Sequence, residues 1–138
     1  MEQVTLTASP TPEELAAIGD NLARFNEADV GPSGRVPLAL LLRDGAGAIV
    51  GGLSGYTAWG WLYVQWLWLA ESQRGSGWAG RLLADAEAES RRRQCHGAYI
   101  DTFNPTALKV YQRAGYVAFG ALPDFPKGRT RTFLQKAL

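Results

Sequence analysis

A glycine-rich turn is the segment whose residue types point most directly to chemistry. It reads Arg74-Gly-Ser-Gly-Trp-Ala-Gly80 and lies between an apolar run and an amphipathic stretch. If those neighbours are a strand and a helix, the turn presents several unpaired backbone N–H groups at the positive end of the helix dipole. Such a concavity binds phosphate, and glycine keeps it open because no Cβ holds the anion away from the backbone. With the guanidinium of Arg74 at its rim, the turn predicts a phosphate-binding site.

Three other interpretations of this turn compete with that one. A tight strand-to-helix turn needs no ligand at all. A P-loop would share the spacing of Gly75 and Gly80, but Arg81 and Leu82 stand where that motif needs a lysine and a hydroxyl. The G-x-G-x-x-G pattern of dinucleotide-binding oxidoreductases is present once Gly77 is included. Only 58 residues follow the last of these glycines, however, which is short for the remaining crossover units of that fold.

A second segment decides between these interpretations. It reads Asn104-Pro-Thr-Ala-Leu-Lys-Val-Tyr-Gln-Arg-Ala-Gly-Tyr116. It resembles the N-x-x-A-x-x-x-Y-x-x-x-G-F/Y helix of the GNAT superfamily of acyl-CoA-dependent N-acyltransferases. Arg74, Gly77 and Ala79 match the Q/R-x-x-G-x-G/A loop of the same family. The resemblance covers nearly all of the 138 residues, residues 1–35 being the least specific part.

The resemblance implies an acetyl-CoA site between two splayed central strands. Backbone groups of the central strand would pair with pantetheine, the glycine turn would hold the pyrophosphate, and the second helix would line the thiol end. No metal is implied. The residues implied to bind acetyl-CoA are Leu67, Trp68, Leu69, Arg74, Gly75, Ser76, Gly77, Trp78, Ala79, Gly80, Asn104, Ala107 and Tyr111.

The implied reaction is direct attack of an amine on the acetyl thioester while both substrates are bound. A backbone N–H near Leu69 would stabilise the oxyanion. Tyr111 would be the catalytic residue that gives the leaving thiolate a hydrogen bond or a proton, since a free tyrosine has a pKa of about 10 and a thiol about 8.5. The central strand WLYVQWLWLA carries no carboxylate to deprotonate the amine. The candidate bases are Glu71, Asp101, Glu27 and Asp29, and a chain of water molecules is an equal alternative.

The periodicity of the apolar residues predicts the elements that position this site. The expected fold is α/β (α+β): a mixed, mostly antiparallel sheet of about seven strands, flanked by helices, in a single domain over residues 1–138. Glu87 falls on the predicted water-facing side of the second helix, whose C-cap is expected at Gly97. The predicted strands are 4–7, 36–42, 48–57, 61–70, 98–103, 116–121 and 130–136, and the predicted helices begin at 12, 79 and 105.

Composition limits the function further. The net charge of +1 gives no global field to attract nucleic acid or a membrane surface. Residues 1–70 carry three basic and seven acidic side chains, a net of −4, which weakly favours a cationic acceptor. A single cysteine, Cys95 beside His96, favours neither a disulfide nor a metal site, and a reducing cytoplasm is the expected compartment. Arg91 to Arg93 are expected to be solvated at the end of their helix.

Several functional alternatives stay open at this level. The acceptor is a small-molecule or peptide amine, and its identity is not specified by the sequence. Trp59, Trp61, Trp66 and Trp68 could be core residues, a homodimer interface or a wall for the acceptor. A non-catalytic CoA-binding sensor or scaffold would keep the same pocket, and a dinucleotide-binding oxidoreductase would bind NADH instead.

Overall fold

The computed structural model describes all 138 residues, which divide into two compact units, Met1–Ser33 and Gly34–Leu138. The first unit contains one helix, α1 (Pro12–Val30). Its start is as predicted: the Thr11 side chain accepts from the Glu14 N–H, the Glu14 carboxylate accepts from the Thr11 N–H, and Pro12 occupies the first turn. No helix is both long and apolar enough to cross a membrane.

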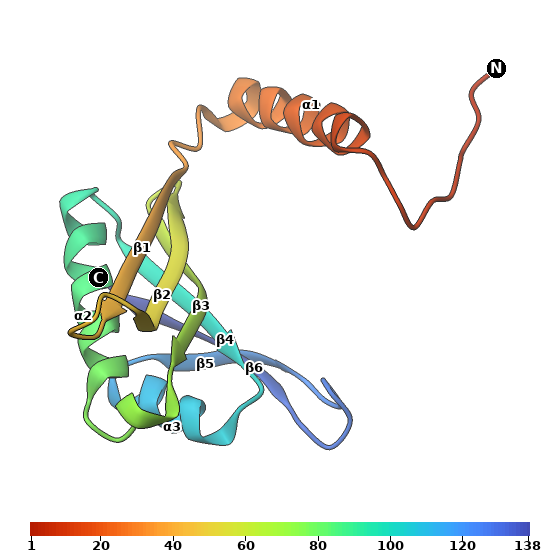
Figure 1. Cartoon of the computed structure of the whole chain (residues 1–138). Coiled ribbons are helices and arrows are strands. Elements are labelled where there is room, and N and C mark those ends of the chain that lie inside the picture. The colour runs from red at the N-terminus through yellow and green to blue at the C-terminus, as the bar shows by residue number, and fades with distance from the viewer. The chain divides into compact units, whose positions relative to one another are not determined.

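The second unit contains the sheet and two further helices (Figure 1). Its elements agree with the predicted ones to within about two residues at most ends. They are β1 (Val36–Arg43), β2 (Ile49–Ala58), β3 (Trp61–Leu69), the short 3-10 helix η1 (Glu71–Gln73), α2 (Trp78–Arg92), β4 (Gly97–Thr102), α3 (Pro105–Arg113), β5 (Val117–Leu122) and β6 (Arg131–Ala137).

The sheet has six strands in the order β1-β2-β3-β4-β6-β5, not the seven expected. The missing strand is the one predicted for residues 4–7, which have no regular structure. Four alternating residues carry a strand pattern, but a strand forms only where a neighbour accepts its backbone hydrogen bonds. All adjacent pairs are antiparallel except β3 and β4, which α2 connects as a crossover. A single parallel pair also excludes a dinucleotide-binding fold.

The two central strands separate toward one end. β3 pairs with β4 from Trp61 only as far as Val64, opposite Ile100, whereas β3 continues to Leu69 along β2. A bulge begins where the pairing with β4 stops, because Ser54 lies opposite Trp66 and Gly55 opposite Val64, which leaves Gln65 as an extra residue on β3. The central strands are therefore splayed, as expected from the family resemblance.

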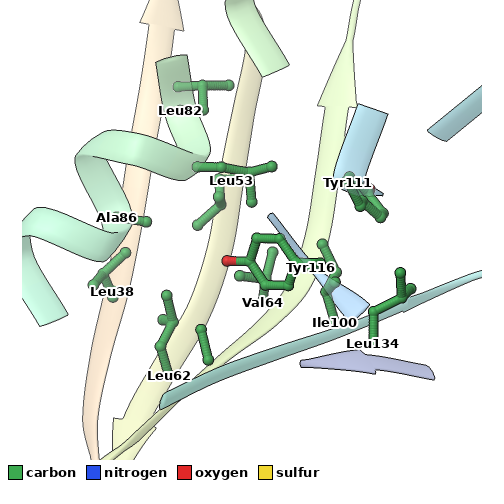
Figure 2. Close-up of a cluster of buried hydrophobic side chains, with 12 residues drawn as sticks. Leu38, Leu53, Leu62, Val64, Leu82, Ala86, Ile100, Tyr111, Tyr116 and Leu134 are labelled. Carbon is green, nitrogen blue, oxygen red and sulfur yellow. The ribbon is translucent and has the colours of Figure 1, made fainter. Parts of the chain in front are cut away.

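One hydrophobic core fills the space between α2 and the sheet (Figure 2). Alternate residues of the central strands, such as Leu62, Val64 and Ile100, point into it, and Leu83 and Ala86 meet them from α2. Tyr111 and Tyr116, which flank the end of α3, belong to the same cluster. The core thus fixes α2 and α3 against the strands that splay.

The end of α2 differs from the prediction. The helix stops at Arg92, and Gln94 makes the left-handed turn with a φ of 66°, whereas Gly97 is the first residue of β4. Glycine is needed at position 97 for packing, because a Cβ there would collide with the Trp61 ring. Arg93 is not simply solvated: its guanidinium donates to the carbonyl oxygens of Val36 and Pro37 and so ties the helix end to β1.

Candidate functional site

A cavity of about 920 Å³ opens where β3 and β4 separate. Its wall is built by the end of β3, the glycine turn with α2, the end of β4, α3 and one residue of β6. Every residue implied by the family resemblance to bind acetyl-CoA lines this cavity, except Ser76. The lining residues not singled out in the sequence are Leu83, Ala84, Glu87, Thr102, Thr106, Val110, Arg113, Ala114 and Lys136.

The open edge of β3 presents backbone hydrogen-bonding groups to the cavity. The Ala70 N–H donates to the carbonyl oxygen of Val50 over 2.8 Å, so residue 70 faces the β1–β2 side. Because backbone groups alternate in direction along a strand, those of Leu69 and Leu67 face the opposite side, where β4 has turned away. The Leu69 N–H therefore faces the side from which β4 has separated, while the Leu69 carbonyl accepts from Arg74 Nε over 3.1 Å.

The glycine turn is open, and the protein provides no hydrogen-bond acceptor for the backbone N–H groups of residues 75–80. Gly77 is the N-cap of α2 in the left-handed conformation, and no side chain caps the first turn of the helix. Gly75 also has a positive φ, of 78°, and no atom lies within 4 Å of where a Cβ would stand on Gly75, Gly77 or Gly80. The backbone N–H groups of this turn therefore have the exposure and direction that an anion requires.

Tyr111 is nearly buried, with 5% of its surface exposed, and yet its hydroxyl has no hydrogen-bond partner in the protein. No fully buried polar side-chain atom lacks a partner, so this oxygen keeps some exposure to solvent, and Tyr111 is part of the cavity wall. Burial and, to a smaller extent, the charge of Asp101 raise the pKa of Tyr111 to about 12. The hydroxyl consequently keeps its proton at neutral pH and can donate one hydrogen bond into the cavity.

Asn104 begins the helix that carries Tyr111. Its side-chain oxygen accepts from the N–H groups of Thr106 and Ala107, over 2.9 and 3.1 Å, and Pro105 occupies the first turn. The structure therefore gives Asn104 a role as the N-cap of α3, in addition to its place in the cavity wall. This cap explains why the segment starts with asparagine followed by proline.

Comparison with known proteins agrees with this geometry. The model of the acetyltransferase (GNAT) family matches residues 5–116. The chain belongs to the GNAT family. An acetyltransferase of Agrobacterium fabrum is 47% identical over 124 residues, which are 90% of each chain, and blasticidin-S acetyltransferase of Streptomyces morookaense is 41% identical over 93 residues, 67% of this chain and 68% of the relative. A crystal structure of an acetyltransferase from Bacillus cereus has a TM-score of 0.86 at 26% identity and covers 97% of this chain and 98% of its own. The protein is thus a GNAT-family acyltransferase.

The candidate bases of this GNAT protein are placed very differently. Glu71 is exposed in η1 and does not line the cavity, and Glu27 and Asp29 lie in α1, in the other compact unit. Asp101 is mostly buried and forms an ion pair with Arg131, from Nε to Oδ1 over 2.8 Å. Of these acids, Asp101 is the one whose charge acts on Tyr111.

Cys95 and His96 do not form a nucleophilic pair in this enzyme. The thiol is buried, and burial raises its pKa, which is the opposite of what a reactive thiolate needs. The His96 ring packs edge-on against Trp61 with 5.2 Å between ring centroids. Both side chains therefore contribute to packing.

Glu87 is the residue that the sequence interpretation placed wrongly. It was expected on the water-facing side of α2, but it is buried, lines the cavity and accepts from the Tyr116 hydroxyl over 2.9 Å. Its second carboxylate oxygen accepts from Lys136 Nζ over 2.7 Å. Burial, together with the charge of Glu87 and the hydrogen bond to it, raises the pKa of Tyr116. One signal was present: Glu87 follows the core residue Leu83 by four positions, on the same helix face.

Proposed function

We propose that the protein transfers an acetyl group from acetyl-CoA to an amine, by direct attack of the amine while both substrates are bound. The observation that carries this proposal is the cavity at the splay, which the glycine turn and Tyr111 both line. The catalytic group is Tyr111. Phosphate-binding and thiol-binding chemistry would then lie at the two ends of one pantetheine arm.

The residues of the cavity suit acetyl-CoA. The uncapped first turn of α2 offers backbone donors for the pyrophosphate, and three cationic side chains, Arg74, Arg113 and Lys136, are part of the wall. The unpaired edge of β3 at Leu67 and Leu69 offers amide groups with the spacing of a strand, which suits the amides of pantetheine. Bound acetyl-CoA would supply the acetyl group as an activated thioester.

In the transfer, the amine nitrogen forms a bond to the acetyl carbon and the carbon–sulfur bond breaks, its electron pair remaining on sulfur. The Leu69 N–H stabilises the charge that develops on the carbonyl oxygen. The Tyr111 hydroxyl donates a hydrogen bond to the departing sulfur. Because the pKa of Tyr111 is about 12 and that of a thiol about 8.5, the hydroxyl stabilises the thiolate without transferring its proton completely. The nitrogen loses its proton and the sulfur gains one by exchange with solvent, which leaves an amide and a thiol.

The acceptor is proposed to be an amine of a small molecule or peptide. One relative, 41% identical, carries the name blasticidin-S acetyltransferase, which makes blasticidin S the first acceptor to test. The excess of acidic side chains in residues 1–70 favours a cationic acceptor, because opposite charges attract.

Thermal unfolding with acetyl-CoA or with NADH tests the first part of this proposal. A ligand at one hundred times its dissociation constant stabilises the folded state by about 2.7 kcal/mol, which raises the midpoint by several degrees in a domain of this size. We expect a rise with acetyl-CoA and none with NADH. Thiol release from acetyl-CoA is then measured with blasticidin S and with a panel of small amines and peptides. No rise with acetyl-CoA, or no thiol release with any acceptor, would contradict the proposal.

A further inference from the structure

Glu87 has an unusual environment for a carboxylate. It is an ionisable side chain buried in the core, with 3% of its surface exposed, although α2 has a solvent-facing side on which it could have been placed. A buried charge is costly unless it is paired and hydrogen-bonded. Both of its oxygens have partners: Oε2 accepts from the Tyr116 hydroxyl and Oε1 from Lys136 Nζ, over 2.9 and 2.7 Å.

Both partners of Glu87 lead to the C-terminal end of α3. Lys136 Nζ also donates to the carbonyl oxygen of Ala114, over 2.8 Å. The backbone N–H of Tyr116 donates to the carbonyl oxygen of Tyr111, over 3.0 Å. The carboxylate is therefore connected through Tyr116 to Tyr111, which lines the cavity, and through Lys136 to Ala114, the C-cap of the same helix.

This connection matters because the Tyr111 hydroxyl has no protein partner of its own. Only the ring packing and the backbone of Tyr111 determine where the hydroxyl lies. α3 is nine residues long, so its last turn depends on contacts outside the helix for its position. A shift at its end moves the hydroxyl directly.

We infer that Glu87 is a positioning residue for the acetyl transfer, acting through Tyr116 to hold Tyr111 at the thiol end of the cavity. The inference rests on the proposed function, since it gives Tyr111 a reaction to serve. A carboxylate suits the task because it accepts two hydrogen bonds at once and balances the Lys136 ammonium. A glutamine at position 87 would accept through only one oxygen and would not balance the Lys136 ammonium, because it carries no charge.

Tyr116→Phe is the sharpest variant, because it removes one hydroxyl, keeps the buried ring and replaces no residue that lines the cavity. We expect kcat to fall by about tenfold to a hundredfold, the range that a displacement of a catalytic group by about 1 Å produces. The KM for acetyl-CoA should stay within about twofold, since the displaced hydroxyl acts on the leaving sulfur. Glu87→Gln should shift kcat in the same direction. Asp85→Asn, an exposed position on the same helix, is the matched control and should change nothing.

The decisive comparison combines Tyr116→Phe with Tyr111→Phe. If Glu87 and Tyr116 act through the Tyr111 hydroxyl, Tyr116→Phe lowers kcat in the wild type and changes it by less than about twofold once that hydroxyl is gone. Equal losses in both backgrounds would show a general structural effect and overturn the inference. A Tyr111→Phe variant with unchanged kcat would instead refute the catalytic role of Tyr111, and the positioning role with it.

A second readout does not depend on activity. Hydrogen exchange of the residue 116 amide, whose N–H bonds the Tyr111 carbonyl, should become faster in Tyr116→Phe and in Glu87→Gln than in Asp85→Asn. If this amide is equally protected in all three variants, the carboxylate does not hold the end of α3 and the inference fails.

Discussion

Arg74 Nε donates to the carbonyl oxygen of Leu69 over 3.1 Å, and this bond joins the glycine turn to the open edge of β3. The sequence predicts Arg74 at the rim of a phosphate site. The bond to the Leu69 carbonyl gives Arg74 a second role, because it fixes the end of β3, where the Leu69 N–H faces the cavity. One side chain would therefore serve both the pyrophosphate-binding turn and the thioester end of the proposed acetyl-CoA site. An arginine can do this because its guanidinium has five N–H donors, and Nε uses only one of them here.

Replacement of Arg74 tests that double role. Arg74→Lys retains a positive charge but loses the planar group that bonds Leu69 while facing the cavity. We expect the KM for acetyl-CoA to rise about tenfold and kcat to fall as well, because the edge of β3 is less well fixed. Steady-state kinetics at varied acetyl-CoA measures both. A rise in KM with kcat unchanged would mean that Arg74 contributes charge alone.

The pH dependence of kcat reports the state of Tyr111. Since its pKa is raised to about 12, its hydroxyl keeps the proton throughout the range in which most amines become neutral. We expect kcat, measured with saturating substrates, to rise or stay level from pH 7 to pH 10. A descending limb with a midpoint below 10 that disappears in Tyr111→Phe would contradict this environment for the hydroxyl.

The same raised pKa makes the free energy of unfolding depend on pH in the alkaline range. A tyrosine with a pKa of about 10 when unfolded and about 12 when folded binds its proton more tightly in the folded state. Its contribution is therefore complete below pH 10 and is lost as pH rises from 10 to 12. For Tyr111 the loss approaches about 2.7 kcal/mol, at about 1.4 kcal/mol for each pKa unit. The pKa of Tyr99 is also raised to about 12, chiefly by burial, so it adds to the fall.

Urea unfolding at pH 9 and at pH 11 measures this effect. The wild type should lose more stability between the two values than Tyr111→Phe does, because the variant lacks one of the titrating groups. Equal losses in the two proteins would show that Tyr111 has an ordinary pKa in the folded state. Asp85→Asn, at an exposed position of α2 that removes no tyrosine, is the control and should resemble the wild type.

The sequence predicts those parts of the site that short, local residue patterns determine. The glycine turn needs positive φ at Gly75 and Gly77, and Asn104 followed by proline is a helix start, so each is recognisable within a few residues. The family resemblance adds the splay, because it connects two such segments across the chain. These features agree with the structure because short-range geometry determines them.

The features that were missed depend on partners far away in the chain. Glu87 is buried because Lys136, 49 positions later, and Tyr116, 29 positions later, neutralise and bond its carboxylate. Arg93 is held by carbonyls of β1 that precede it by up to 57 positions. Helical periodicity assigns charged residues to water, and only the tertiary structure can show that such a residue has a partner in the core.

Gly55 provides a test of how the splay is made. It lies at the bulge, opposite Val64, and a Cβ at this position would overlap the carbonyl oxygen of Tyr63 in β3. Gly55→Ala must therefore push β2 from β3 or remove the bulge, and we expect a loss of about 3 kcal/mol or more in the free energy of unfolding. Gly45→Ala, in the β1–β2 turn, is the control, since nothing lies within 4 Å of its Cβ and its φ is not positive.

Activity in the folded fraction of Gly55→Ala distinguishes stability from geometry. If the bulge directs the end of β3 into the cavity, the variant should also bind acetyl-CoA at least tenfold more weakly at a temperature where it is fully folded, because Leu67 and Leu69 no longer face the opening. Gly45→Ala should bind as the wild type does. A folded Gly55→Ala protein with normal affinity would show that the separation of β3 from β4 does not depend on the bulge, and the packing of α3 against β4 would then be the cause to test.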